Sequence, residues 1–235
     1  MRVWAISDTH FSNDQSKPMD CFGEIWVDHT SKINGNWKKY VSHDDIVMIG
    51  GDISWGNQLE TVLPDLVTLS ELPGIKKIMV KGNHDYWWRK AEKIKNKIPA
   101  NLVMLEGNAV KHHEMAFCGT RGWLAPNDPY FTAIDQKTYN KELKLLDQAL
   151  QEAVKLKPKE GIHLLMHFAP FTSRGETTSF FDLIRSYPVS TLSFGHFHKK
   201  EEWETTPTGK IDHIDCFLTS TDYLGHKPQM IWKTD

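Results

Sequence analysis

Five short motifs rich in aspartate and histidine follow one another along the chain. They are Asp8-Thr9-His10, Gly51-Asp52, Gly82-Asn83-His84-Asp85, His167 and Gly195-His196-Phe197-His198. Their side chains supply carboxylates, imidazoles and a carboxamide, which are good ligands for borderline divalent metals. A single residue of this kind is more often a surface or helix-capping group. The ordered set, in contrast, predicts a metal centre that supports hydrolytic chemistry.

Each motif follows a stretch of chain that is expected to form a buried strand. The fifth motif follows Thr191-Leu192-Ser193-Phe194, and the other four follow short apolar runs at residues 3–6, 46–49, 78–80 and 164–166. Short apolar runs are typical of buried strands. Open α/β sheets place ligand sites in the loops at the carboxyl ends of their strands. We therefore expect the motifs to gather at such an edge.

Four amphipathic segments are expected to form helices. They run from Phe22 to Tyr40, from the N-cap Asn57 to Leu72, from Tyr86 to Ile98 and over residues 136–156. Strand, motif and helix in alternation predict an α/β fold with a parallel-rich sheet and helices outside it. Beyond residue 201 the pattern changes, and strands are expected at residues 202–205, 211–216 and 230–232.

Composition narrows the class of protein. The 235 residues carry a formal net charge of -2, which gives no indication of a nucleic-acid surface but does not exclude a nucleotide substrate. Cys21, Cys118 and Cys216 are widely spaced and form no Cys-x-x-Cys pair, which favours a reducing compartment over a disulfide framework. No apolar leader and no apolar stretch of the roughly 20 residues that span a bilayer are evident. We therefore expect a soluble cytoplasmic protein without a membrane partner.

Because motifs from both ends of the chain should converge on one site, we predict a single domain over residues 1–235.

Together the five motifs resemble the pattern of the calcineurin-like metallophosphoesterase superfamily, from Asp8 to His198. The residues around them are similar to a family of small bacterial predicted phosphohydrolases of unassigned substrate; these are Lys17-Pro18-Met19-Asp20, Gly51-Asp52-Ile53-Ser54-Trp55, Asp85-Tyr86-Trp87-Trp88 and Gly119-Thr120-Arg121-Gly122-Trp123. The resemblance implies a four-layer αββα sandwich, in which two mixed sheets are flanked by helices. The C-terminal β section would complete the second sheet.

The resemblance also implies a ligand set for two divalent metals. Asp52 would bridge them, as a carboxylate with two outward-facing oxygens can. The first metal would take Asp8, His10, Asp52 and His198, and the second Asp52, Asn83, His167 and His196. Mn(II) is expected, with Fe next and Zn or Ni as alternatives, because this mixed nitrogen and oxygen ligand set suits all of them.

His84 differs from its neighbours because in the family it faces the substrate. It would stabilise charge on the phosphoryl oxygens or protonate the leaving oxygen, while a hydroxide activated by the two metals attacks phosphorus. Asp85 would orient the His84 ring and raise its pKa. Alternatively, Asp85 caps a helix that begins at Tyr86.

Four further residues are candidate substrate contacts. Trp55 and Trp123 lie in or just after motif loops, where they would either stack on a flat leaving group or pack into the core. Core packing is favoured for Trp87 and Trp88. Arg121 and Arg174 would bind a phosphate, or form surface ion pairs. Trp55 also stands where many family members carry an acidic residue.

The sequence thus predicts a metal-dependent phosphoesterase that acts on a small phosphate ester. A phosphodiesterase is preferred over a monoesterase because His84 can serve as leaving-group acid. The alternatives are a non-catalytic scaffold on the same fold and a metal-dependent nuclease. Oligomeric state and natural substrate do not follow from the sequence.

Overall fold

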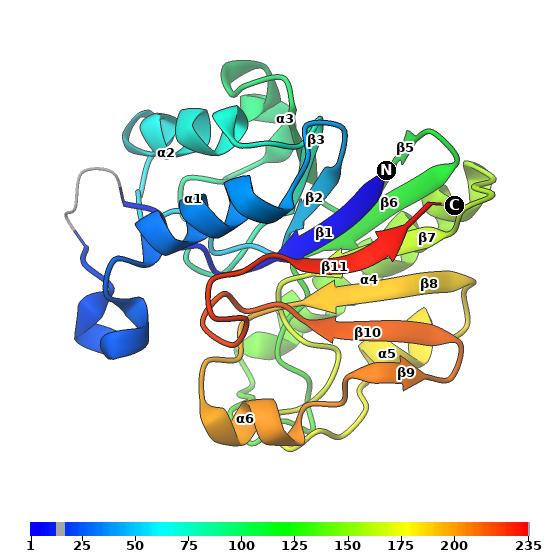
Figure 1. Ribbon diagram of the computed structural model, residues 1–235. Coiled ribbons are helices and arrows are strands. Elements are labelled where there is room, and N and C mark those ends of the chain that lie inside the picture. The colour runs from blue at the N-terminus through cyan, green and yellow to red at the C-terminus, as the bar shows by residue number, and fades with distance from the viewer. Residues whose placement is uncertain (13–16, 235) are drawn as a thin grey trace. The chain divides into compact units, whose positions relative to one another are not determined.

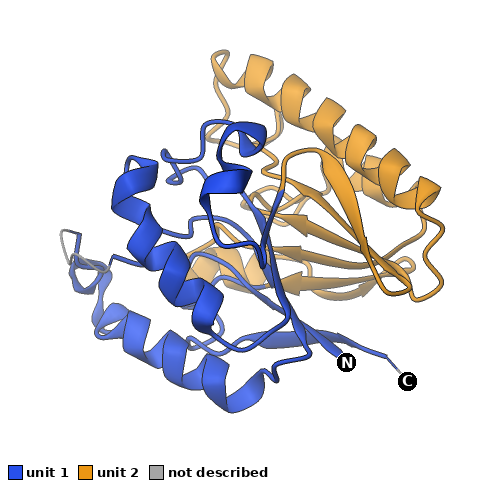
Figure 2. Ribbon diagram, turned by 90° about the horizontal axis from the view of Figure 1, so that it is seen from above, with its two compact units in different colours: residues 1–104, 219–235 blue, residues 105–218 orange. Residues whose placement is uncertain are grey.

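The computed structural model describes residues 1–12 and 17–234, which form two compact units (Figures 1 and 2). Unit 1 contains residues 1–104 and 219–235, and unit 2 contains residues 105–218. Each unit has its own mixed sheet, and helices flank each sheet. The expectation of two mixed sheets with flanking helices is therefore confirmed, while the single domain stays a prediction.

Unit 1 is built on a five-stranded sheet with the order β11-β1-β2-β3-β4. The strands are β1 (Arg2–Ile6), β2 (Ile46–Ile49), β3 (Lys76–Val80), β4 (Leu102–Leu105) and β11 (Gln229–Lys233). β1, β2 and β3 are parallel neighbours, and β11 pairs antiparallel with β1. The three central parallel strands are the ones that precede the first three motifs, so these motifs leave the same edge of the sheet.

The helices of unit 1 share a core with one face of this sheet. They are α1 (His29–Tyr40), α2 (Leu59–Glu71), the short α3 (Ala91–Ile94) and the 3-10 turns η1 (Asp20–Phe22), η2 (Glu24–Trp26) and η3 (Lys95–Lys97). Ile6 and Ile49 of the strands belong to one apolar cluster with Trp37 of α1 and Leu66 of α2. The intervening strand residues are also fully buried. A sheet covered on both faces explains why its strands read as continuous apolar runs.

Unit 2 contains a six-stranded sheet with the order β5-β6-β7-β8-β10-β9. Its strands are β5 (Asn108–His112), β6 (Met115–Thr120), β7 (Ile162–Met166), β8 (Val189–Phe194), β9 (Gly209–Ile211) and β10 (Ile214–Leu218). The inner four run parallel, and the outer β5 and β9 are antiparallel to their neighbours. The helices are α4 (Asp135–Lys155), α5 (Ser179–Ile184) and α6 (Lys200–Thr205). α4 contacts β5 and β6, and it confirms the helix expected over residues 136–156.

The helix expected from Tyr86 to Ile98 is largely wrong. Tyr86 and Trp87 form a turn, closed by the Trp88 amide, which donates to the carbonyl of Asp85 at 3.1 Å. Trp87 and Trp88 are 2% and 0% exposed, as their expected core packing requires. Trp87 Nε1 donates to Asp85 Oδ1 at 3.0 Å, which holds the chain in this turn, and the helix α3 begins only at Ala91.

Two expectations for the C-terminal region are corrected. Residues 202–205 belong to α6, because Glu202 accepts from the Lys199 amide at 3.1 Å and so caps a short helix. The strand was predicted because polar and apolar residues alternate in this segment, as they do in a half-buried strand. The strand at residues 230–232 exists as β11, but it pairs with β1 in unit 1 instead of completing the sheet of unit 2. Only β9 and β10 extend that sheet.

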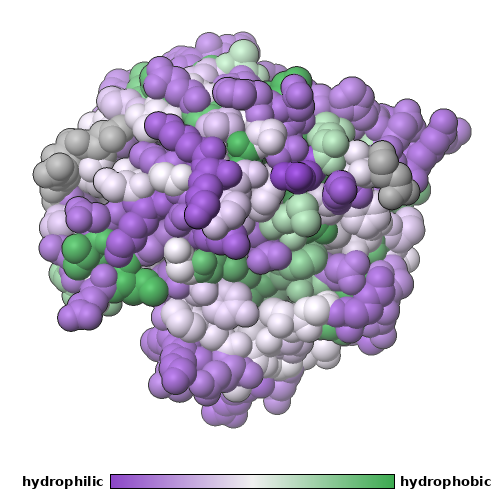
Figure 3. Space-filling view, viewed as in Figure 1, coloured by the Kyte–Doolittle hydropathy of each residue, from purple (hydrophilic) through white to green (hydrophobic). Residues whose placement is uncertain are grey.

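Apolar side chains are exposed on the segment that holds η1 and η2. Phe22, Ile25 and Val27 are 65%, 43% and 45% exposed, and Figure 3 shows apolar surface at the left, where Figure 1 draws this segment in blue. The segment therefore contributes few core residues, and α1 begins later than expected, at His29. None of the helices in residues 1–12 and 17–234 is long and apolar enough to cross a bilayer.

Candidate metal centre

The loops that follow β1 and β2 are joined by main-chain hydrogen bonds. The amides of Asp8, His10 and Phe11 donate to the carbonyls of Gly51, Asp52 and Ile53, each at 2.9 Å. The strand pairing of β1 with β2 is thereby extended past the ends of both strands. Because of this register, the first two motifs lie side by side.

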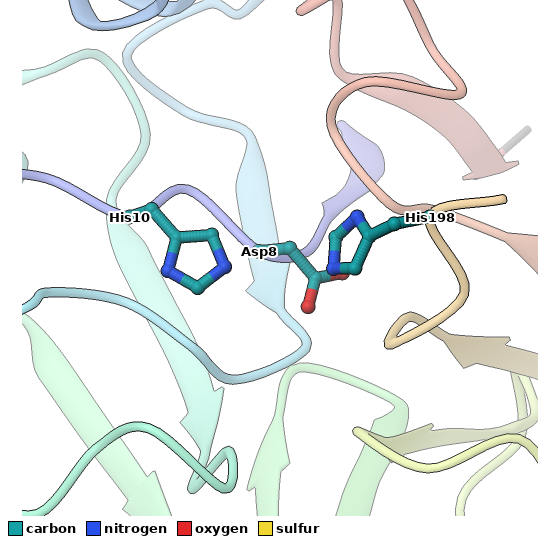
Figure 4. A group of neighbouring side chains, drawn as sticks. All are labelled: Asp8, His10 and His198. Carbon is teal, nitrogen blue, oxygen red and sulfur yellow. The ribbon is translucent and has the colours of Figure 1, made fainter. Parts of the chain in front are cut away.

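Asp8, His10 and Asp52 form a buried cluster within unit 1. They are 0%, 3% and 1% exposed. Potential ligand atoms of Asp8 lie within 4.8 Å of those of His10 and of Asp52, and His10 Nε2 lies 3.8 Å from Asp52 Oδ2. Figure 4 shows Asp8 and His10 projecting from the segment after β1. Two desolvated carboxylates so close together repel each other unless positive charge is nearby, so this donor set fits a divalent cation.

The backbone is strained at the predicted ligands. Asp8, His10 and Asp52 have φ values of 59°, 46° and 49°, and His196 in unit 2 has a φ of 73°. They are four of the nine non-glycine residues with positive φ in the described chain. Such conformations persist where the surrounding structure enforces them, and they concentrate at functional sites.

Two glycines allow the loops after β2 and β3 to approach each other. Gly51 has a φ of 84°, and a Cβ there would lie 2.6 Å from the amide nitrogen of Gly82. A Cβ on Gly82 would overlap the carboxylate and the amide nitrogen of Asp52. The glycines that precede Asp52 and Asn83 are therefore required by close contact between the loops.

The third motif is fixed to the second by two carboxylates. The His84 amide donates to Asp52 Oδ1 at 2.8 Å. Asp85 is fully buried; its Oδ2 accepts from the Gly82 amide at 2.8 Å, and its Oδ1 accepts from the Ile53 amide at 2.9 Å and from Trp87 Nε1 at 3.0 Å. Asp85 thus clamps the two loops together. The helix-cap alternative for Asp85 is wrong because a turn follows it, and its orientation of the His84 ring stays a prediction.

Trp55 lies beside two of the imidazoles in unit 1. Its ring stacks on that of His10, with centroids 4.7 Å apart and an interplanar angle of 22°. The His84 ring is 4.8 Å away and tilted by 54°. His84 and Asn83 are both half-buried. The structure therefore places Trp55 against predicted site residues.

In unit 2, the fourth and fifth motifs follow β7 and β8. The Gly195 amide donates to the carbonyl of His167 at 3.0 Å, and the His167 and His196 rings lie edge to face, 5.1 Å apart. His167 is fully buried, whereas His196 and His198 are half-buried. The His198 amide donates to Glu202 at 3.3 Å. The division of ligands between a first and a second metal stays a prediction.

The remaining substrate candidates also lie in unit 2, where two of them have protein partners. Arg121 Nη2 lies 3.4 Å from Glu142 Oε1, and its guanidinium stacks 4.4 Å above the Trp123 ring. Trp123 Nε1 donates to Asp135 at 2.9 Å. These contacts favour the structural alternatives for Arg121 and Trp123. Arg174 is exposed, on the loop between β7 and α5.

Sequence reasoning missed residues that support the ligands. His29 is buried, and its Nε2 contacts the carbonyl of His10 at 3.1 Å. Burial lowers the pKa of His29, which favours a neutral ring that donates to this carbonyl. Glu202 similarly holds the segment around His198. No spacing in the sequence connects His29 with His10, whereas a glutamate shortly after the last motif could have been recognised as a capping signal.

Comparisons with known proteins give the family of the chain and agree with its fold. A family model described as calcineurin-like phosphoesterase matches residues 1–200. A crystal structure described as the protein of unknown function AQ665 from Aquifex aeolicus is 17% identical, with a TM-score of 0.50, and the match covers 97% of this chain and 95% of that one. This likeness concerns the fold alone. No protein with a curated description matches the chain.

Proposed function

Because the chain belongs to the calcineurin-like phosphoesterase family, we propose that it is a metal-dependent hydrolase of small phosphate esters that prefers diesters. The observation that carries the proposal is the buried cluster of Asp8, His10 and Asp52. Two carboxylates that are buried close together are costly unless positive charge is nearby, which a bound cation would supply.

The proposed metal ligands come from all five motifs. Asp8, His10, Asp52 and Asn83 would be the ligands from unit 1, and His167, His196 and His198 those from unit 2. Two divalent cations, when bound, supply a water of lowered pKa and Lewis acidity toward the phosphoryl oxygens. Mn(II) is the proposed metal, with Fe, Zn or Ni as alternatives.

His84 is the proposed acid of the reaction. Its amide is bonded to Asp52, so the position of its backbone depends directly on the proposed bridging ligand. A protonated imidazole there would give its proton to the leaving oxygen, or donate a hydrogen bond to the phosphoryl group. The availability of this leaving-group acid is the reason that a diester is preferred over a monoester. Arg174, an exposed residue of the loop between β7 and α5, is a proposed phosphate contact. Arg121 is the weaker candidate because its guanidinium already contacts Glu142 and Trp123.

The test is hydrolysis of paired bis-aryl phosphodiester and aryl phosphomonoester substrates by metal-stripped protein with Mn(II) added back. Diester cleavage should require Mn(II) and disappear in Asp52→Asn. It should fall in His84→Ala, and the loss should approach about 10²–10⁴-fold, which is usual for a general acid, as the leaving phenol becomes more basic. His43→Ala, which removes an exposed histidine of unit 1, is the matched control and should leave the rate unchanged.

Three outcomes would contradict the proposal or a part of it. If the wild type cleaves neither ester with Mn, Fe, Zn or Ni, the hydrolase proposal fails and the alternative of a non-catalytic scaffold takes its place. Faster cleavage of the monoester, undiminished in His84→Ala, would remove the diester preference and the role of His84. Unchanged turnover and KM in Arg121→Ala would end the substrate role of Arg121.

A further inference from the structure

Trp55 is held in place by contacts around its indole. Nε1 lies 3.0 Å from the sulfur of Met19, and the Lys17 ammonium lies 5.2 Å above the ring. Lys17 also donates to the Trp55 carbonyl at 3.3 Å, and the Trp55 amide donates to the carbonyl of Phe11 at 3.0 Å. The side chain and the main chain of Trp55 are thus both tied to the segment that follows β1.

The preceding residue adds a second anchor. Ser54 is buried, and its hydroxyl donates to Asp65 of α2 at 2.5 Å. Because Ser54 and Trp55 are adjacent, α2 fixes the course of the chain at the point where the indole leaves it. A half-buried side chain on so constrained a backbone is suited to hold its neighbours in place.

The indole contacts the imidazoles of two predicted site residues, His10 and His84. It stacks on His10, and it lies within 4.8 Å of the His84 ring, while the His10 and His84 rings are 5.9 Å apart. An imidazole without a wall beside it rotates about its side-chain bonds. The stacked His10 ring covers one face of Trp55, so that face is not open to the flat group of a substrate.

We propose that Trp55 is a positioning residue that orients the imidazoles of His10 and His84, and that it is not a wall for the substrate. This inference rests on the proposed function, because it assigns Trp55 a part in the same site. A ring that orients the leaving-group acid changes turnover more than binding. A ring that stacks on the substrate changes KM. The two roles therefore predict different kinetics.

The test compares Trp55→Ala, Trp55→Phe and the control Trp232→Ala, which removes a half-buried tryptophan of β11 in the same unit. We expect kcat of Trp55→Ala to fall by about tenfold to a hundredfold, as for a misplaced catalytic group, with KM changed less than about threefold. The loss should grow with the pKa of the leaving alcohol, because poor leaving groups depend on the acid. Trp55→Phe should restore most of the rate, and Trp232→Ala should retain all of it.

A second readout does not depend on activity. In NMR spectra of the metal-free protein, the ring protons of His10 and His84 should be shielded by the indole and move downfield in Trp55→Ala. A raised KM with unchanged kcat, or ring protons that do not move, would overturn the proposal. If the wild type hydrolyses no ester, the proposed function fails by itself, and the ring shifts still decide whether the Trp55 indole lies against the two imidazoles in solution.

Discussion

Replacing Asp85 by asparagine tests whether this carboxylate clamps the loops that carry the predicted ligands. The side chain is fully buried and accepts hydrogen bonds from the amides of Gly82 and Ile53 and from Trp87 Nε1. In Asp85→Asn, one oxygen can keep the donors of Ile53 and Trp87. The new NH2 group then faces the Gly82 amide, so two donors meet where a donor and an acceptor met before.

The size of the effect follows from these bonds. An N–H bonded to a carboxylate contributes about 1.5–3 kcal/mol, and a buried N–H without an acceptor costs about 1–3 kcal/mol. We therefore expect the free energy of unfolding to fall by about 2–4 kcal/mol in Asp85→Asn. With an m-value of about 3 kcal/mol per molar urea, the unfolding midpoint moves by about 1 M. Loosening both loops should also weaken Mn(II) binding by about tenfold to a hundredfold, as is usual for residues that support metal ligands.

The assay is urea unfolding of metal-free protein followed by tryptophan fluorescence, together with Mn(II) titration. Seven of the nine tryptophans lie in unit 1, since only Trp123 and Trp203 belong to unit 2, so fluorescence reports mainly on unit 1. Asp45→Asn is the matched control. Asp45 is 3% exposed and accepts from the amides of Arg2 and Ser42 and from Trp4 Nε1, at the starts of β1 and β2.

Both variants should lose similar stability, but only Asp85→Asn should lose metal affinity. Equal Mn(II) affinity in the two variants would refute the clamp, because it would mean that the ligand loops keep their places without Asp85. An unchanged urea midpoint in Asp85→Asn would refute the energetic reasoning itself.

Two further predictions concern single positions. Gly82→Ala should displace Asp52 and weaken Mn(II) binding at least tenfold. The control is Gly35→Ala in α1, where a Cβ meets nothing within 4 Å, and it should raise the free energy of unfolding by about 0.5–1 kcal/mol. Equal Mn(II) affinity in the two variants would contradict the close-contact argument. Burial lowers the pKa of His163 from 6.5 to about 4. The unfolded chain therefore binds more protons between these pH values, and stability should be complete above pH 6.5 and fall by about 3 kcal/mol toward pH 4. Urea unfolding at several pH values should show this slope in the wild type and a flatter one in His163→Gln.

The strands before the motifs could be predicted because burial in a sheet determines which residues they contain. Residues 3–6, 46–49, 78–80, 164–166 and 191–194 all lie in strands of the two sheets. The first four are continuous apolar runs, and a run of that length fits a strand that is buried on both faces. The helix predicted from Tyr86 to Ile98 was wrong over its first residues, because the hydrogen bond from Trp87 Nε1 to Asp85 holds the chain there in a turn. In residues 202–205, a cap formed by Glu202 outweighed an alternating pattern.

For the site, the order of the motifs along the chain predicts which loops lie together but not how their side chains contact one another. Motifs that follow neighbouring parallel strands must leave the same edge, which is why Asp8, His10 and Asp52 come together in unit 1. The contacts of Trp55 with His10 and His84, and the clamp formed by Asp85, depend on where side chains turn within loops. No periodicity encodes such directions, so the sequence left the role of Trp55 open between substrate and core.

The energetics of the ligand loops explain why they can hold their shape before a metal arrives. Left-handed backbone costs about 1–2 kcal/mol per residue, so Asp8, His10 and Asp52 together cost about 3–6 kcal/mol. The three main-chain bonds between the loops contribute about 1 kcal/mol each, and the three bonds accepted by the Asp85 carboxylate contribute about 1.5–3 kcal/mol each. Hydrogen bonding is therefore large enough to offset the strain of the backbone. Repulsion between the buried carboxylates of Asp8 and Asp52 is a separate cost, and it is the one that a bound cation would lower.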